Sequence, residues 1–160
     1  MQARLEPHKV APAAYQAMSG LENYIRKSSK LEPSLLELIR MRASQINGCA
    51  FCLDMHSKDA RAEGETEQRL YTLSAWRETP FFTLREQAAL AWTEALTLIA
   101  EGHAPDDVYE EVRKQFSEEE LVNLTLAIVT INGWNRMAIG FRMVPGAYQS
   151  AKRKEEVSAK

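Results

Sequence analysis

The sequence GCAFCLDMHSKDARAEG occupies residues 48–64 and is bounded by two glycines, which are typical of helix ends. No proline or further glycine interrupts it, so we expect one helix from about Cys49 to Glu63. Offsets of three, four and seven residues separate Cys49, Cys52 and His56, and side chains at these offsets share one face of a helix. The stretch therefore predicts that two thiols and an imidazole lie together.

Outside this stretch, apolar residues also recur at helical spacing, and no segment alternates as a half-buried strand does. Two capping boxes, Thr83 with Glu86 and Ser117 with Glu120, mark helix starts. The predicted helices cover about residues 13–27, 33–46, 49–63, 66–77 and 83–102, then one segment from 105 and a last one from 117. We therefore predict an all-α bundle of about six to seven helices.

The length of 160 residues fits a single domain, and 45% apolar residues suffice for a core without disulfides or structural metals. Within that domain we expect an N-terminal helical segment at residues 1–29 and a helical core at residues 30–148. Residues 149–160 carry many charges and few large apolar groups, so we expect a frayed tail there.

The charge pattern and the apolar tracts limit the partners of the chain. The net charge is −2 and the pI is about 6.0, with basic residues scattered among acids, which is not the electropositive surface typical of nucleic-acid binding. The first ten residues lack the pattern of a signal peptide, and the longest apolar tract, 121–131, is too short to span a bilayer. We therefore expect a cytoplasmic protein that binds neither nucleic acid nor membrane.

The last predicted helix is apolar on nearly every side, up to a polar break at Asn132-Gly133. Such a helix must be buried all round, either at the centre of the domain or partly against another subunit. This pattern favours a homo-oligomer.

The two cysteines are the only ones in the chain and lie too close together to staple distant segments. Cys49 lies at the predicted helix start, where the helix dipole favours a thiolate, and His56 lies one turn from Cys52 and can deprotonate it. A thiolate can attack a peroxide to give a sulfenic acid, which the second thiol converts to a disulfide. The same pair can instead exchange with a partner disulfide.

Two other interpretations of the cluster are open at this point. Two small apolar cysteines and a hydrogen-bonded histidine can simply line a buried helix. Two thiolates and an imidazole are also acceptable zinc ligands, and Glu37 could add an oxygen, but no second CxxC and no nearby histidine completes a closed site of four. The compact helical spacing also differs from a zinc-knuckle loop, so we expect neither a metal nor another cofactor.

Glu37, followed twelve positions later by Cys49 and then by Cys52 and His56, resembles the pattern of the alkylhydroperoxidase D (AhpD) and carboxymuconolactone decarboxylase family. The stretch INGCAFCLDMHSKDARAEGETEQRLYTLSAWRE, with the later ALAWTEALTL and LTLAIVTINGWNR, is similar to single-domain AhpD-like proteins over about residues 30–142. The resemblance implies an AhpD-like helical fold assembled into trimers or hexamers. It also implies peroxidase activity toward organic peroxides or hydrogen peroxide, with reduction by a dithiol donor such as a lipoyl or thioredoxin-like protein.

The family pattern makes Cys52 the attacking thiol, Cys49 the resolving thiol, and His56 with Glu37 a proton relay. The helix dipole favours Cys49 instead, but a specific base beside Cys52 should outweigh a partial charge of about half a unit, so we adopt the order of the family. Without the resemblance, a helix-borne glutamate beside Arg40 would be typical of a solvated surface.

One feature departs from the family pattern. The cysteines enclose Ala50-Phe51, whereas the characterised peroxidase of the family carries a histidine just before its second cysteine. That proton carrier is absent here, and Phe51 would give the thiols an apolar wall instead. The alternative enzyme is a decarboxylase-like lyase, which works without a redox cysteine pair, and the non-enzymatic alternative is a redox sensor or adaptor.

Overall fold

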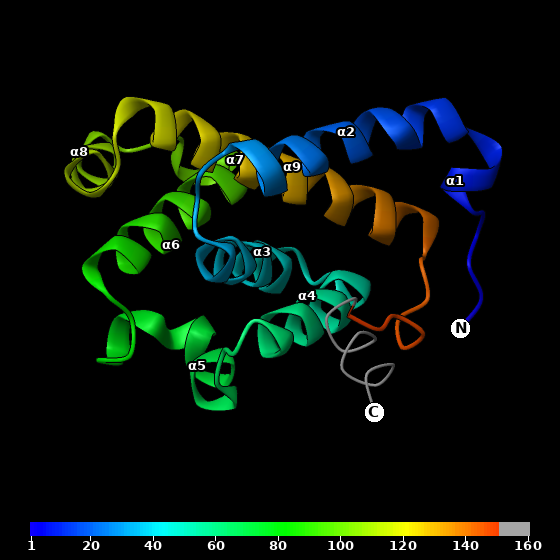
Figure 1. Cartoon of the computed structure of the whole chain (residues 1–160), viewed down its shortest axis with the longest axis horizontal. Helices are drawn as coiled ribbons and strands as arrows, with labels where there is room; N and C mark the ends of the chain where they lie inside the picture. The colour runs from blue at the N-terminus through cyan, green and yellow to red at the C-terminus, as the bar shows by residue number, and fades with distance from the viewer. Residues whose placement is uncertain (151–160) are drawn as a thin grey trace.

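The computed structural model describes residues 1–150, which fold into helices joined by short connections (Figure 1). Over these residues there are nine α-helices, one 3-10 helix and no β-strand. In chain order they are α1 (Pro7–Val10), α2 (Pro12–Ser28), α3 (Pro33–Asn47), α4 (Ala50–Ala62), α5 (Glu67–Thr72), η1 (Leu73–Glu78), α6 (Leu84–Thr97), α7 (Ile99–Gly102), α8 (Asp106–Gln115) and α9 (Glu118–Phe141). The all-α fold predicted from the sequence is confirmed.

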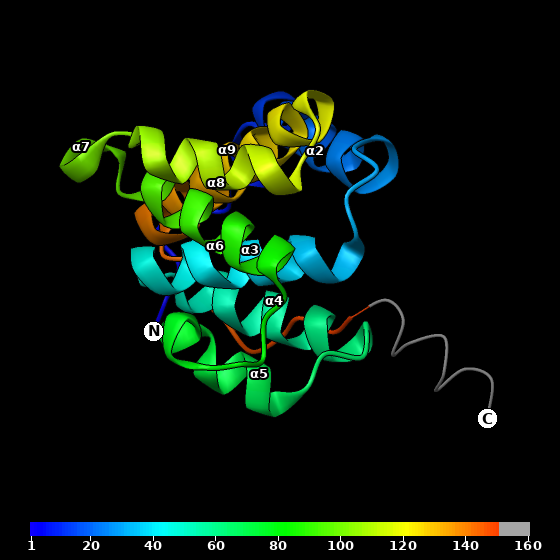
Figure 2. The same cartoon turned by 90° about the vertical axis from the view of Figure 1, so that its left-hand side faces the viewer.

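Helix α3 lies at the centre of the bundle. It packs against α4, α6 and α9. In Figure 2, α4 and α5 lie below α3, and α8, α9 and α2 lie above it. Helix α2 also packs along α9, and α8 packs on α6. Because α3 is covered from several sides, its polar side chains are enclosed together with its apolar ones.

Helix α3 begins and ends where the sequence predicts. Pro33 occupies its first turn, where the missing N–H costs nothing. At its end Gly48 has a φ of +68°. The N–H groups of Gly48 and Cys49 donate to the carbonyls of Gln45 (3.3 Å) and Ser44 (3.0 Å), which is the Schellman arrangement. Gly48 therefore turns the chain directly into α4, whose N-cap is Cys49.

Two of the predicted helices are divided in the structure. The segment 66–77 forms α5 and then η1, with non-helical backbone angles at Ala75. The segment 83–102 breaks at Leu98 and continues as the four-residue α7. Together with the short α1, these divisions raise the number of helices above the six to seven expected.

Helix α9 continues through the polar break at Asn132-Gly133 as far as Phe141. A side chain at Gly133 would place its Cβ 2.9 Å from Met18 of α2, so the glycine allows α2 to approach rather than ending the helix. Val122 and Val129 are 68% and 56% exposed, so the chain alone does not bury this helix all round, and burial against another subunit stays a prediction.

Two apolar clusters form most of the core. The larger one contains fully buried side chains of α3 and α9, such as Ile39 and Ile128. The second contains Leu38, Leu73 and Leu90, which are also fully buried. Each such side chain contributes about 1.5–3 kcal/mol to folding, so α3 is held firmly between its neighbours.

Within residues 1–150, no helix is both long enough and apolar enough to cross a membrane. The frayed tail predicted for residues 149–160 lies outside the described part of the chain from residue 151 onward.

Candidate active site

Four polar residues form a stripe along one side of α3. Glu37, Arg40, Ser44 and Asn47 follow one another at intervals of three, four and three residues, so they share one helix face. Glu37, Arg40 and Ser44 are 4%, 3% and 0% exposed, because α3 is the central helix. Glu37 is therefore not a solvated surface acid. Buried polar groups are costly unless they are paired, so each must have a partner inside the protein.

Cys49 and Cys52 lie at the start of α4 and are joined by a disulfide, with their Cα atoms 5.4 Å apart. The Sγ atom of Cys49 accepts a hydrogen bond of 3.4 Å from the N–H of Cys52. Both cysteines are 1% exposed. The side chains around them are apolar and include Phe51, as the sequence predicts: Ala43, Phe51, Ile131, Trp134, Ala138 and Met143.

His56 lies one turn after Cys52 and is 3% exposed. Its Nδ1 is 2.8 Å from Oε2 of Glu37, and Oε1 of Glu37 accepts a hydrogen bond of 2.6 Å from Nη1 of Arg40. Burial raises the pKa of Glu37, but the hydrogen bonds and charges of His56 and Arg40 outweigh it and lower that pKa below its usual value. Glu37 is therefore ionised, so Nδ1 of a neutral imidazole carries the proton and Nε2 remains the basic nitrogen.

Further charged groups extend this pair toward α2 and the C-terminal segment. Arg40 donates from Nη2 to Oε1 of Glu22 (2.6 Å), which also accepts from Nε of Arg26 (2.8 Å). Nη2 of Arg26 lies 3.9 Å from Oδ2 of Asp59. The hydroxyl of Tyr148 lies 2.8 Å and 2.9 Å from the two oxygens of Asp59. One network thus ties α2, α3, α4 and the segment after α9 together.

Amide side chains occupy the other end of the α3 stripe, beside the cysteines. Nδ2 of Asn47 donates to the side-chain oxygens of Asn132 (2.9 Å) and Asn135 (2.8 Å). Asn135 in turn donates to Oγ of Ser44 (3.0 Å), the residue whose carbonyl accepts from the N–H of Cys49. These bonds fix α3 against α9 at the turn that leads into α4.

Glu37, His56 and Asp59 are the described residues that come nearest to a metal site, with one potential ligand atom from each lying within 4.8 Å of the others. Glu37 is already bound by Arg40, and Asp59 by Tyr148 and by the nearby guanidinium of Arg26. Both carboxylates therefore already have partners within the protein, so the donor set fits an ion-pair network better than a metal.

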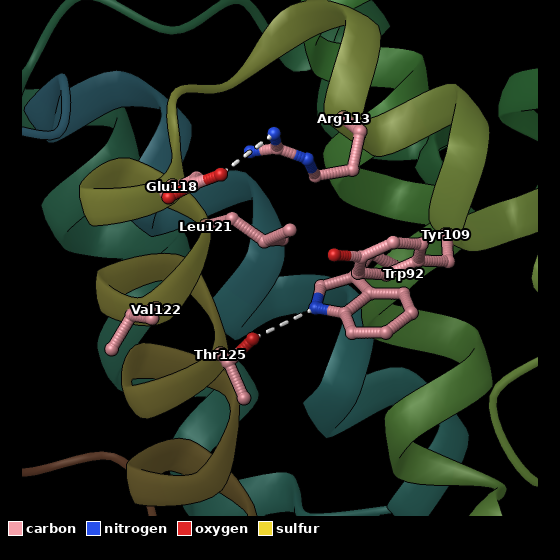
Figure 3. Close-up of a pocket in the computed structure, with 7 residues that line it drawn as sticks. All are labelled: Trp92, Tyr109, Arg113, Glu118, Leu121, Val122 and Thr125. Carbon is pink, nitrogen blue, oxygen red and sulfur yellow. Dashed lines mark hydrogen bonds and ion pairs between the residues drawn. The ribbon is translucent and has the colours of Figure 1, made fainter.

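A separate open hollow lies between α6, α8 and the first half of α9 (Figure 3). Its volume is about 400 Å³. Two polar pairs cross it, Nε1 of Trp92 with Oγ1 of Thr125 (3.0 Å) and Arg113 with Glu118 (3.2 Å). The cysteines instead pack against Ile131 and Ala138 in the second half of α9. The residues that line the hollow therefore differ from those that surround the cysteines.

The structure brings the four predicted site residues into two bonded pairs. Cys49 is bonded to Cys52, and Glu37 is hydrogen-bonded to His56. The two pairs are linked through α4, which carries Cys52 and His56 one turn apart. The other two histidines, which no motif assigns to the site, are exposed.

The residues that surround the Glu37–His56 pair were not predicted from the sequence. Arg40 lies three residues after Glu37 and Asp59 three residues after His56, so helical spacing could have found both. Tyr148 reaches Asp59 across 89 positions, and no sequence pattern indicates that contact.

The helical bundle with its paired cysteines defines an AhpD-like protein. The chain belongs to the carboxymuconolactone decarboxylase family, whose sequence model matches residues 12–95.

Two relatives resemble the chain over most of its length. It is 46% identical over 139 residues to the uncharacterized protein YdfG of Bacillus subtilis, which covers 87% of this chain and 94% of YdfG. A protein of unknown function from Agrobacterium tumefaciens, for which an antioxidant defence role of the AhpD kind has been suggested, is 48% identical. That structure matches with a TM-score of 0.88 and covers 92% of this chain and 100% of its own. The debrominase Bmp8 shares the fold, with a TM-score of 0.76 at 21% identity over 93% of this chain and 78% of Bmp8.

Proposed function

We propose that the chain is a thiol-dependent peroxidase in which Cys49 and Cys52 cycle between a dithiol and a disulfide. One arrangement carries the proposal: the two sulfurs are within bonding distance at the start of α4, and one turn later His56 is oriented by an ionised, buried Glu37. The likeness to the Agrobacterium protein with its suggested antioxidant role supports the same function.

The first half of the cycle oxidises the two thiols. Nε2 of His56 takes the proton of Cys52, and the thiolate attacks the terminal oxygen of R–O–O–H. The O–O bond breaks, Cys52 becomes a sulfenic acid, and the leaving alkoxide takes the proton from His56 to give ROH. Cys49 then attacks Sγ of that sulfenic acid, and the S–O bond breaks to release water and form the disulfide.

The second half of the cycle restores the dithiol. A dithiol donor of the lipoyl or thioredoxin-like class attacks the disulfide, passes through a mixed disulfide and leaves oxidised. The sum is ROOH plus a dithiol giving ROH, water and the donor disulfide. Neither half needs a metal or another cofactor.

We also propose that the working form is a homo-oligomer, a trimer or a hexamer, located in the cytoplasm. Val122 and Val129 lie seven residues apart on α9, so they share one face of the helix, and both are more than half exposed. Exposed apolar groups on one face of a long helix favour contact with another subunit.

The proposal is tested by following peroxide consumption with dihydrolipoamide and with reduced thioredoxin as donors. We expect catalytic turnover by the wild-type protein with at least one donor, and none by C52S. Full activity of the C49S/C52S double variant would replace the proposal with the lyase alternative. Oxidation of the protein without turnover, across both donors, would replace it with the redox-sensor alternative.

A further inference from the structure

A second carboxylate lies beside the Glu37–His56 pair. Asp59 follows His56 by three residues on α4 and is 8% exposed. One of its oxygens, one ring nitrogen of His56 and one oxygen of Glu37 all lie within 4.8 Å of one another. An imidazolium at position 56 would therefore have an anion on both α3 and α4.

The charges of the surrounding network are unbalanced while His56 is neutral. Glu22, Glu37 and Asp59 contribute three carboxylates, whereas Arg26 and Arg40 contribute two guanidinium groups. A proton on His56 supplies the missing positive charge. The network therefore stabilises the imidazolium that forms when His56 takes the proton of Cys52, and it does so in a buried setting where such interactions are strong.

Asp59 is held by a tyrosine from the segment that follows α9. Residues 142–150 run back alongside α4, as the orange-to-red trace shows (Figure 1). The N–H of Gly146 donates to Oδ2 of Asp54 (3.0 Å), and Lys58 donates to the carbonyl of Tyr148 (3.1 Å). These two bonds attach the segment to the surface of α4, and the phenol ring of Tyr148 reaches inward to Asp59.

The Tyr148 hydroxyl acts as a hydrogen-bond donor rather than as an acid. Burial, together with the hydrogen bond to Asp59 and the charge of that residue, raises the pKa of Tyr148 well above its usual value. Its proton therefore stays on the phenol, and the hydrogen bond fixes the direction of the Asp59 carboxylate.

We infer that Asp59 and Tyr148 are positioning residues of the thiol centre: Asp59 stabilises the protonated form of His56, and Tyr148 holds Asp59 in place. The inference deepens the proposed peroxidase function and rests on it, since it assigns how the base of that reaction is supported. The proton taken from Cys52 remains on Nε2 of His56 until the leaving group accepts it, and no further redox step is involved.

The direct test is the absorbance of the Cys52 thiolate at 240 nm, measured at pH 7 in a reduced C49S background. In D59N we expect the ratio of thiolate to thiol to fall by about tenfold, the equivalent of one pKa unit. The rate of oxidation of the same protein by hydrogen peroxide should fall in proportion to the thiolate fraction. Y148F leaves the charge of Asp59 in place, so we expect a smaller loss of about threefold in both readouts, as for one neutral hydrogen bond.

The matched control for D59N is D54N, on the same helix and attached to the same segment through Gly146. If the thiolate depended only on the attachment of residues 142–150 to α4, D54N would lower the thiolate absorbance as much as D59N does. We expect D54N to leave it unchanged. Y71F, which removes the hydroxyl group of an exposed tyrosine, is the control for Y148F.

Unchanged thiolate absorbance in D59N, or equal losses in D59N and D54N, would overturn the inference. Should D59N fail to fold, the comparison of Y148F with Y71F takes its place, and equal thiolate absorbance in those two variants would overturn the inference as well. The absorbance needs no peroxide, so this result is separate from the fate of the proposed function. That function fails if the reduced wild-type protein keeps its thiols in the presence of peroxide.

Discussion

At Cys49 and Cys52, two physical effects favour different thiolates. Cys49 is the N-cap of α4, where the helix dipole and the free N–H groups stabilise an anion. Cys52 lies one turn from a histidine that Glu37 orients through its Nδ1. In the proposed mechanism this histidine acts directly on the Cys52 thiol, so Cys52 is the attacking residue and Cys49 the resolving one.

This order predicts different products from the two single cysteine variants. In C49S we expect one equivalent of peroxide to leave Cys52 as a sulfenic acid, because no resolving thiol is present. In C52S we expect no rapid oxidation at Cys49. Dimedone labelling followed by intact mass measurement distinguishes the two, and labelling of C52S but not of C49S would reverse the assignment.

Glu37 should matter for stability as well as for chemistry. Among the residues that the structure describes, E37Q leaves the buried Arg40 with Glu22 as its one carboxylate partner, and breaking a buried ion pair typically costs about 3 kcal/mol or more. We expect a loss of about 3 kcal/mol in the free energy of unfolding at pH 7, measured by urea denaturation. The substitution E101Q on an exposed residue of α7 should have almost no effect.

The free energy of unfolding that E37Q loses should become smaller as the pH falls. The pKa of Glu37 is lowered in the folded protein, so its contribution is fully present above the usual carboxyl pKa of 4.5. It is lost as the pH falls through the lower folded value. The stability difference between wild type and E37Q should therefore shrink below about pH 4, and a difference that grows with acid would contradict the ionised Glu37.

At the scale of elements, the turn between α3 and α4 determines where the cysteines lie. Gly48 adopts the left-handed conformation there, and the following N–H closes the Schellman arrangement on Ser44. A side chain in this conformation costs about 1–2 kcal/mol. G48A should lower the free energy of unfolding by about that amount, measured by urea denaturation.

Gly20 provides the matched control. It lies within α2, and nothing lies within 4 Å of where its Cβ would be. G20A should raise the free energy of unfolding by about 0.5–1 kcal/mol, because alanine is the better helix former. A loss in G20A equal to that in G48A would mean that the left-handed turn is not the cause.

Helix boundaries were predictable because they depend on local chemistry. The first-turn Pro33, the αL Gly48 and the capping boxes at Thr83 and Ser117 all appear where the sequence indicates. The break at Leu98 was not predictable, since no proline or glycine marks it.

Burial and long-range contact could not be predicted from the sequence. The stripe of Glu37 and Arg40 has the spacing of a solvent-facing surface, and only the central position of α3 encloses it. Tyr148 meets Asp59 because the segment after α9 folds back on α4, which depends on the whole fold. By contrast, the cluster of Cys49 and Cys52 follows from spacing alone, because one helix start carries both.

At the scale of the whole molecule, the exposed valines of α9 predict how subunits meet. V129K should place a charge in the proposed subunit contact and lower the mass measured by sedimentation velocity. L84K, at the even more exposed first residue of α6, is the control and should leave the mass unchanged. Equal masses for wild type and V129K would exclude this face of α9 as the contact.

The molecule as a whole holds the two cysteines at one turn of a helical bundle, and we propose that peroxide oxidises their thiols. The most direct measurement is the number of thiols per chain in the reduced wild-type protein, counted in denaturant after acid quenching. We predict that one equivalent of peroxide removes both thiols, of Cys49 and Cys52, within one fast phase. An unchanged count of two thiols per chain would contradict the account.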